Sequence, residues 1–151
     1  MSLEDDIRTL SALPVFDQME VEAVRLIAFS AISKTLKPGE VLFKAGDMSE
    51  GGYLVVSGSI AIEKPMPSLA PRQIIPAGAL IGEVALIIET QCVGTATAYR
   101  EEAMVLFVPR TLFLRVLQEF PSSATRMKAG ITKRLVGFSD QLAKFRQNHF
   151  D

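Results

Sequence analysis

The chain has little of the chemistry that metal, redox and disulfide sites require. Its 151 residues include one cysteine and one histidine. A single cysteine cannot form an internal disulfide, and an iron–sulfur cluster needs about four cysteine ligands. The histidine, His149, stands near the carboxyl end, far from the segments that carry the binding-site pattern described below. It is a poor choice for a haem ligand, a metal ligand or a general base. We therefore expect no metal centre, no cofactor and no catalytic residue.

Long hydrophobic runs and a strong net charge are also absent. The longest apolar stretch, residues 79–88, is interrupted by Gly82 and Glu83 and is shorter than the roughly 20 residues of a membrane span. Residues 4–6 are all acidic, whereas a secretory signal needs a cationic region there. The net charge of −1 gives no overall attraction to nucleic acid. These absences predict a cytoplasmic protein that binds neither a membrane nor nucleic acid directly.

The hydrophobic pattern that is present divides the chain into three parts of one domain, residues 1–151. Residues 1–31 have helical periodicity, with a break at Pro14 and a second helix capped by Asp17, whose capping box Glu20 completes. Residues 32–108 consist of short β-branched and aromatic runs separated by glycine and proline turns. Residues 109–147 return to helical spacing, first to about Phe120 and then from a serine cap at 122 or 123 onward.

The short runs of residues 32–108 are typical strands. They lie at 41–43, 53–56, 59–62, 73–75 and 104–108. Ser57 and Gly58 stand between two of them and predict a tight hairpin, because glycine tolerates the positive φ of such turns. Many short strands at near-regular spacing predict a mainly β fold with flanking helices. We expect an antiparallel β-roll, a jelly-roll-like double-stranded β-helix, with N-terminal helices and a long C-terminal helix.

The last predicted helix carries an apolar seam with alternating spacings of four and three residues, which is typical of a coiled coil. A helix that packs on its own domain produces a similar period. The seam continues to the end of the helix, where little of the chain remains to cover it, so we expect a homodimer. The seam residues are Ile131, Leu135, Phe138, Leu142 and Phe145.

Residues 78–98 contain the strongest candidate for a binding site. Gly82 allows the backbone to approach a ligand closely. The amides of Glu83, Val84, Ala85 and Leu86 are expected to point out of the N-terminus of a short helix, which is an anion-binding arrangement. The carboxylate of Glu83 stands among apolar residues and could accept hydrogen bonds from a pair of sugar hydroxyls.

Together with this segment, the glycines at 39 and 46 and the run at residues 53–60 resemble the cyclic-nucleotide-binding domains. These occur in catabolite-activator-type (Crp/Fnr) regulators, in regulatory subunits of cyclic-nucleotide-dependent kinases and in gated channels. The resemblance implies a phosphate-binding cassette that holds cyclic AMP or cyclic GMP. Gly82 and Glu83 then match positions that contact the ribose 2′-hydroxyl, and the amides near Val84 and Ala85 face the phosphate. The ligand-binding set implied in this way also includes Leu86, Cys92, Val93 and Thr95.

The chain departs from this family at the cassette arginine, which follows the glutamate by nine or ten residues. Cys92 and Val93 occupy those positions, and no lysine or arginine occurs between Glu83 and Arg100. The departure predicts weakened or altered nucleotide affinity. In related proteins the last helix caps the pocket, so Lys128, Lys133 and Arg134 are candidates to supply the missing charge.

Alternatives to a nucleotide sensor remain open. The chain could be a ligand-free module for dimerisation or protein interaction, or the sensor half of a Crp/Fnr-type transcription regulator whose DNA-binding domain follows the dimer helix. Cys92 has two interpretations of its own. It is either a small buried hydrophobic side chain or a reactive thiol whose pKa is lowered by a nearby helix N-terminus.

Overall fold

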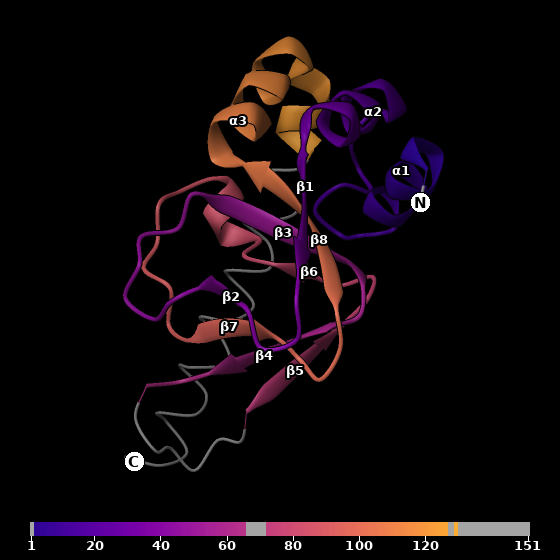
Figure 1. The fold of residues 1–151 in the computed structure, drawn as a ribbon. Coiled ribbons are helices and arrows are strands. Elements are labelled where there is room, and N and C mark those ends of the chain that lie inside the picture. Colours follow the sequence, from indigo (N-terminus) through magenta and orange to yellow (C-terminus); the bar gives the residue numbers. More distant parts are fainter. Residues whose placement is uncertain (1, 66–71, 127–128, 130–151) are drawn as a thin grey trace, which may run out of the picture.

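The structure is a computed structural model of the chain, and it describes residues 2–65, 72–126 and 129. Figure 1 shows a roll of strands with the helices gathered at one end, which confirms the mainly β fold with flanking helices. The helical elements are α1 (Leu3–Ser11), α2 (Val21–Ser30), the 3-10 turn η1 (Val84–Leu86) and α3 (Arg110–Glu119). The strands are β1 (Ile32–Leu36), β2 (Val41–Phe43), β3 (Gly51–Ser57), β4 (Ser59–Glu63), β5 (Gln73–Pro76), β6 (Leu80–Ile81), β7 (Thr95–Ala98) and β8 (Ala103–Pro109).

The described strands form two four-stranded sheets in which neighbouring strands pair antiparallel. Their orders are β1-β8-β3-β6 and β2-β7-β4-β5. Successive side chains of a strand point to opposite faces, and β7 accordingly alternates between half-buried and buried residues. The core between the two sheets contains the fully buried Val55, Ile60 and Val105. This interior holds the roll closed and fixes the strands that flank the candidate site.

The turn at Ser57 and Gly58 joins the two sheets and is not a hairpin. β3 pairs with β6 and β8, whereas β4 pairs with β5 and β7. The predicted hairpin is therefore wrong, although the conformational argument for its glycine holds. Gly58 has a φ of +72°, and a Cβ there would lie 2.6 Å from the Glu102 carbonyl oxygen. A corner between sheets needs the same positive φ as a hairpin turn, so the sequence did not distinguish the two arrangements.

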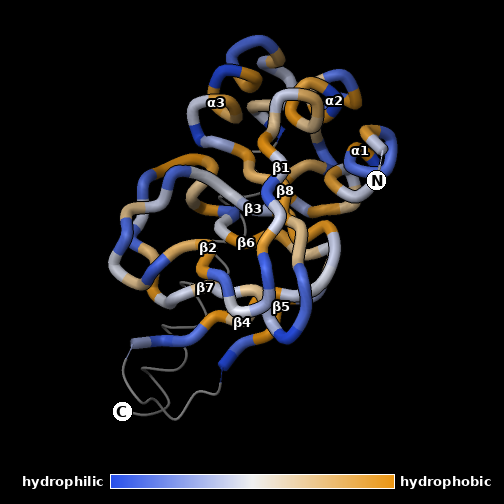
Figure 2. Tube along the Cα trace, in the orientation of Figure 1, coloured by the Kyte–Doolittle hydropathy of each residue, from blue (hydrophilic) through white to orange (hydrophobic). Residues whose placement is uncertain are grey.

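The helices bury the other face of the β1-β8-β3-β6 sheet under a second core. This core joins α1, α2 and α3 to Leu54, Leu106 and Val108 of the sheet and to Leu86 of η1. At its centre the rings of Phe16 and Phe113 meet edge to face, with centroids 5.8 Å apart. Figure 2 shows hydrophobic and hydrophilic residues alternating along the helices and strands, as this two-sided packing requires.

Helix α2 begins later than the sequence predicted. Glu20 is its N-cap residue and makes no side-chain cap hydrogen bond, so the capping box of Asp17 with Glu20 is wrong. Burial of Phe16 holds the preceding chain in turns, in which the Asp17 N–H donates to the Leu13 carbonyl at 2.8 Å. A capping box does occur at α1, between Ser2 and Asp5.

A further helix follows α3 and covers residues 121–126 of the described chain. It begins at Pro121, a favoured first helical residue. Ser123, a predicted cap of this helix, is fully buried, and its hydroxyl instead accepts the Glu20 N–H at 2.8 Å, which ties the helix to the start of α2. None of the described helices is long and apolar enough to cross a bilayer.

The predicted dimer seam and the predicted charge donors of the last helix lie outside the described residues. The seam comprises Ile131, Leu135, Phe138, Leu142 and Phe145, and the donors are Lys128, Lys133 and Arg134. Dimerisation through this helix and its contribution to the pocket therefore remain predictions.

Candidate functional site

The cassette passes from β6 through η1 to β7, and a glycine makes its first bend. Gly82 has a φ of +82°, in the region that favours glycine. A Cβ at this position would lie 3.3 Å from the Gly51 carbonyl oxygen and 3.7 Å from the Gly52 Cα. The glycine was expected to allow the close approach of a ligand. In the structure it lines the cavity and also allows the close approach of β3.

The 3-10 turn η1 leaves fewer outward-pointing amides than the sequence predicted. The Leu86 N–H donates to the Glu83 carbonyl at 3.2 Å and the Ile87 N–H to the Val84 carbonyl at 3.0 Å. The amide of Leu86 is therefore used within the turn, and a role for it in binding an anion remains a prediction. The Leu86 side chain is fully buried, and a Cβ on Gly52 would contact it at 3.1 Å. Leu86 anchors the cassette to the core.

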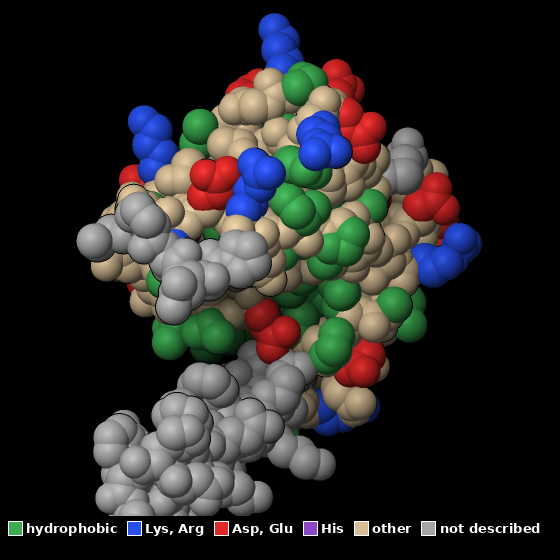
Figure 3. Space-filling view, turned by 90° about the horizontal axis from the view of Figure 1, so that it is seen from below, with side chains coloured by type: hydrophobic (Ala, Val, Ile, Leu, Met, Phe, Trp, Pro, Cys, Tyr) green, Lys and Arg blue, Asp and Glu red, His purple; other side chains and the backbone are tan. Residues whose placement is uncertain are grey.

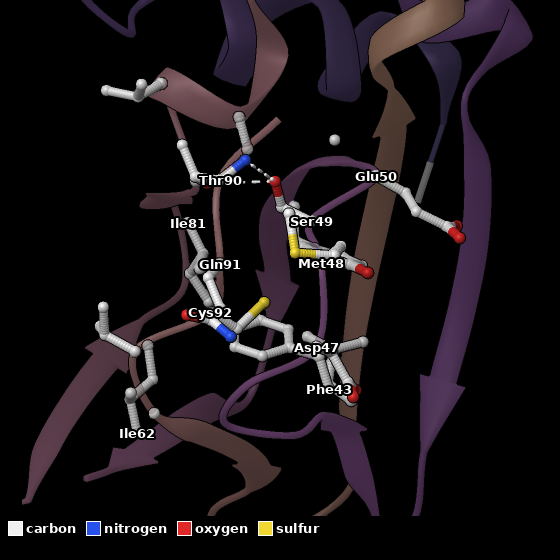
Figure 4. Close-up of a pocket in the computed structure, with 18 of the residues that line it drawn as sticks. Phe43, Asp47, Met48, Ser49, Glu50, Ile62, Ile81, Thr90, Gln91 and Cys92 are labelled. Atoms are coloured by element: carbon white, nitrogen blue, oxygen red, sulfur yellow. Dashed lines mark hydrogen bonds between the residues drawn. The ribbon is translucent and has the colours of Figure 1, made fainter. Parts of the chain in front are cut away.

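A cavity of about 980 Å³ opens between the cassette and the strands that face it. We call two of its surfaces the cassette wall and the aromatic wall. The cassette wall consists of Ile81, Gly82, Val84, Ala85, Thr90, Gln91, Cys92, Val93 and Gly94, and the aromatic wall consists of Lys34, Leu42, Phe43 and Tyr53. Residues 47–51, which run from the end of the β2–β3 loop into β3, and Ile62 complete the lining. Figure 4 shows side chains from these segments directed toward a common space.

The structure divides the predicted ligand-binding residues into two groups. Gly82, Val84, Ala85, Cys92 and Val93 line the cavity, whereas Glu83, Leu86 and Thr95 are outside its lining. Glu83 is half-buried at the N-cap of η1. The Thr95 hydroxyl accepts the Ala45 N–H at 3.0 Å and so fastens the β2–β3 loop to β7. Contact of any of these residues with a ligand remains a prediction.

Sequence reasoning did not assign the β2–β3 loop to the candidate site, although Gly46 was among the residues that carry the family resemblance. The loop runs beside residues 90–92 of the cassette, with hydrogen bonds from the Gly46 N–H to the Cys92 carbonyl and from the Cys92 N–H to the Asp47 carbonyl, both 2.8 Å. The Ser49 hydroxyl accepts the Thr90 N–H at 2.9 Å, drawn as a dashed line in Figure 4. No local signal in the sequence predicts this pairing, because its partners are more than 40 residues apart in the chain.

Cys92 projects from the cassette toward the loop that carries Asp47 and Met48, as Figure 4 shows. Burial raises the pKa of the Cys92 thiol, and the negative charge of Asp47 raises it further. A reactive thiolate requires the opposite shift. The raised pKa argues against the interpretation of Cys92 as a thiol activated by a helix N-terminus, and the structure shows a half-buried free cysteine.

The charged residues of the described pocket lining are Lys34, Asp47 and Glu50. The Lys34 ammonium lies 4.9 Å from the centroid of the Phe107 ring and 5.9 Å from that of Tyr53. Burial raises the pKa of Tyr53, and Cys92 and Glu50 add to the rise. On the outer surface seen in Figure 3, side chains of both signs are interspersed over the described part of that face.

Arg110, the first residue of α3, joins the cassette to the β2–β3 loop. Its guanidinium donates to the Ala85 carbonyl at 2.9 Å and to the Ser49 carbonyl at 3.0 Å, and it lies 3.7 Å from a Glu89 carboxylate oxygen. Its own N–H donates to the Glu50 carbonyl at 2.8 Å. The guanidinium offers several donors in a fixed plane and can serve these acceptors together. The pocket is thereby connected to the helical layer.

Comparison with known proteins agrees with this geometry. A family model described as the cyclic nucleotide-binding domain matches residues 33–120. A lysophospholipase of Neurospora crassa is 35% identical over 104 residues, which are 68% of this chain and 7% of that protein. The cyclic AMP receptor protein of Thermus thermophilus is 30% identical over 132 residues, 81% of this chain and 57% of that protein. The chain thus spans only part of the length of these relatives.

Among solved structures, a cyclic nucleotide-binding-like protein of Brucella abortus is similar with a TM-score of 0.67 and 32% identity, over 76% of this chain and 98% of that one. The family match begins at the second residue of β1 and includes β2 to β8, all of α3 and the entire cassette. The matched family is a regulatory binding domain and not a catalytic one. The chain belongs to the cyclic nucleotide-binding domain family.

Proposed function

We propose that the chain is a cytoplasmic regulatory module that binds a small ligand in the pocket between its cassette wall and its aromatic wall. In this proposal a cyclic nucleotide binds more weakly than to family members that keep the cassette arginine. The observation that carries it is the pairing of a formed cavity, bounded by Gly82, Val84 and Ala85, with Cys92 and Val93 at the arginine positions. The cyclic AMP receptor protein relative supports a nucleotide as the first ligand to test.

The size of the expected weakening follows from the missing charge. Leaving a buried phosphodiester without its ion-pair partner costs about 2 to 5 kcal/mol. A helix N-terminus returns only about 0.3 to 1 kcal/mol. The three-residue η1 also uses the Leu86 amide in its own hydrogen bond, so it offers few free N–H groups to replace the missing cation. Without compensation, the missing ion pair corresponds to a loss of roughly 30-fold to several-thousand-fold in affinity.

Calorimetric titration with cyclic AMP and cyclic GMP tests the proposal. Cys92→Arg restores a cation on the cassette wall and is expected to tighten nucleotide binding at least 30-fold. Ile88→Arg is the matched control, because it adds the same charge to the same segment at a residue that is 55% exposed and outside the pocket lining. Equal effects of the two substitutions, or wild-type binding at low micromolar concentration without any contribution from Lys133 or Arg134, would show the charge argument to be wrong.

The second candidate function is a ligand-free module for interaction or dimerisation. The carboxylate of Asp47 beside Cys92 favours it, since a negative charge there opposes a phosphate. A ligand present at 100 times its dissociation constant stabilises the folded chain by about 2.7 kcal/mol. The interaction module instead predicts no thermal shift with cyclic nucleotides or small anions.

We also infer a homodimer through the seam of Ile131, Leu135, Phe138, Leu142 and Phe145, whose heptad spacing supports it. Sedimentation of the full chain at tens of micromolar is expected to give a dimer, and a monomer would contradict this inference. Direct binding of nucleic acid is not part of the proposed function, and a gel shift at physiological salt tests that point.

A further inference from the structure

The cassette wall has two arms, and both of them line the cavity. The first arm is the part of the wall within residues 81–85, and the second arm is residues 90–94. The proposed function puts the anionic group of the ligand between these arms, because the second arm carries Cys92 at the arginine position. We call the space between the arms the anion subsite. Binding there depends on how precisely the surrounding residues hold the two arms relative to each other.

Hydrogen bonds through a single side chain, that of Arg110, join the first arm to the second. The guanidinium donates from Nη1 to the Ala85 carbonyl at 2.9 Å and from Nη2 to the Ser49 carbonyl at 3.0 Å. Ser49 in turn holds Thr90 of the second arm. The Ser49 N–H donates to the Thr90 carbonyl at 2.7 Å, and the Ser49 hydroxyl accepts the Thr90 N–H at 2.9 Å, as Figure 4 shows for the hydroxyl. Arg110 and Ser49 together therefore fix the spacing of the arms.

Arg110 is poorly placed to stabilise its own helix. It is the first residue of α3, and a positive charge at a helix N-terminus is unfavourable to the helix dipole. Residues 110–113 contain no acidic side chain, and the N-cap Pro109 has no polar side-chain atom. The carboxylate of Glu89, 3.7 Å away, belongs to a side chain that is 60% exposed and adds little. The strong contacts of the Arg110 guanidinium are thus the two carbonyls beside the pocket.

Arg110 also affects the charge of the pocket lining, which includes the carboxylates of Asp47 and Glu50. The charge of Glu50 reaches the interior of the pocket, because it raises the pKa of Tyr53 together with burial and Cys92, which have the larger effects. The backbone N–H of Arg110 donates to the Glu50 carbonyl at 2.8 Å, so the cation is attached next to this carboxylate. Its positive charge offsets part of the negative charge that an anion would meet.

We propose that Arg110 is the positioning residue of the anion subsite, and that through Ala85 and Ser49 it holds the two arms at the separation an anionic group needs. It acts through these carbonyls and not by contact with the ligand, because it is outside the described pocket lining. The fixed fork of a guanidinium serves two acceptors at once, whereas a lysine ammonium is a point charge on a flexible stem. The inference rests on the proposed function, because it assigns a residue to the same site.

The test titrates cyclic AMP and adenosine, which share the base and the ribose, into the full chain. Adenosine lacks the phosphate and leaves the anion subsite empty. Arg110→Gln is expected to weaken cyclic AMP binding about tenfold, the value of one hydrogen bond to a charged group, and to leave adenosine affinity unchanged. Arg110→Lys keeps the charge but loses the fork, so it should weaken cyclic AMP binding as well. Arg115→Gln, which removes an exposed cation from the same helix, is the control and should keep both affinities.

The comparison of the two compounds separates positioning from a general structural role, which would weaken both alike. Circular dichroism checks that each variant is folded at the titration temperature, and Arg110→Lys replaces Arg110→Gln if the latter folds poorly. Equal losses for the two compounds, unchanged cyclic AMP affinity in Arg110→Gln, or full affinity in Arg110→Lys would overturn the inference and leave the proposed function standing. If cyclic AMP binds neither the wild-type chain nor Cys92→Arg, the proposed function fails, and the inference fails with it.

Discussion

The cassette wall and the aromatic wall of the pocket are built in different ways. The aromatic wall stands on paired strands, because Lys34 belongs to β1 and Tyr53 to β3, and both strands pair with β8. The cassette wall begins at Ile81 of the short strand β6 and continues through the three-residue 3-10 turn η1, which is held by the buried Leu86 and the Arg110 guanidinium. Side chains of the cassette wall that lie outside the strands can be replaced without disturbing a sheet. The cassette arginine, which is absent here, belongs to that wall.

The largest expected effect comes from removing the anchor of the cassette wall. Leu86→Ala leaves a cavity beneath η1 and is expected to lower the free energy of unfolding by about 2 to 5 kcal/mol. Ile88→Ala, two residues along the same segment at a position that is 55% exposed, should change it by about 0.5 kcal/mol or less. Chemical denaturation measures both. Similar losses for the two variants would mean that the cassette is not held by the core.

The connection between the cassette and the facing loop is broken by Arg110→Gln. Two carbonyl acceptors, on Ala85 and Ser49, lose a charged donor, so unfolding should become easier by about 1 to 3 kcal/mol. Hydrogen exchange is expected to rise together in residues 46–50 and 84–88, because both segments lose the same partner. Arg115→Gln, at an exposed residue of the same helix, is the control. A rise confined to one segment would contradict a shared anchor.

The bend that starts the cassette wall is tested by a pair of glycines. Gly82 and Gly78 both have positive φ, of +82° and +93°, so alanine carries a similar backbone cost at each. A Cβ at Gly82 lies 3.3 Å from the Gly51 carbonyl oxygen, whereas a Cβ at Gly78 meets nothing within 4 Å. Gly82→Ala should therefore destabilise the chain by about 1 kcal/mol more than Gly78→Ala. Equal losses of stability for the two variants in thermal denaturation would mean that the contact of residue 82 with β3 adds no cost.

The smallest expected effect concerns the thiol of the cassette wall. Burial, and then Asp47, raises the pKa of Cys92, so the folded chain keeps a proton that the unfolded chain releases. This contribution to stability is present below the ordinary thiol pKa and is lost as the pH rises through the higher pKa of the folded state. Cys92→Ser should make the alkaline loss of stability shallower.

Alkylation by iodoacetamide at mildly alkaline pH gives a direct measurement of the same shift. The folded chain should react more slowly than the chain in urea, and Asp47→Asn should make the folded chain faster, because it removes one cause of the raised pKa. A folded thiol that reacts faster than the unfolded one would contradict a raised pKa of Cys92 in the folded chain.

Much of the fold could be predicted because its signals are local. The strands at 41–43, 59–62 and 104–108 were found from β-branched runs and turn residues, and α3 from its helical spacing. The errors occurred where tertiary packing competes with a local preference. Phe16 is buried, and α2 starts after Asp17 and not at it. The predicted hairpin at Ser57 and Gly58 is a corner, because β3 and β4 pair within different sheets.

The sequence by itself predicted the roll, because short strands and turn residues recur at regular spacings, and its resemblance to a known family implied the cassette. It also determined that the cassette contains no cation. The tertiary structure alone decided what faces the cassette: Asp47 beside Cys92, Arg110 between two carbonyls, and Lys34 beside two aromatic rings. Those contacts join residues that are distant in the chain, and such proximity follows from strand pairing and burial, which no local pattern encodes.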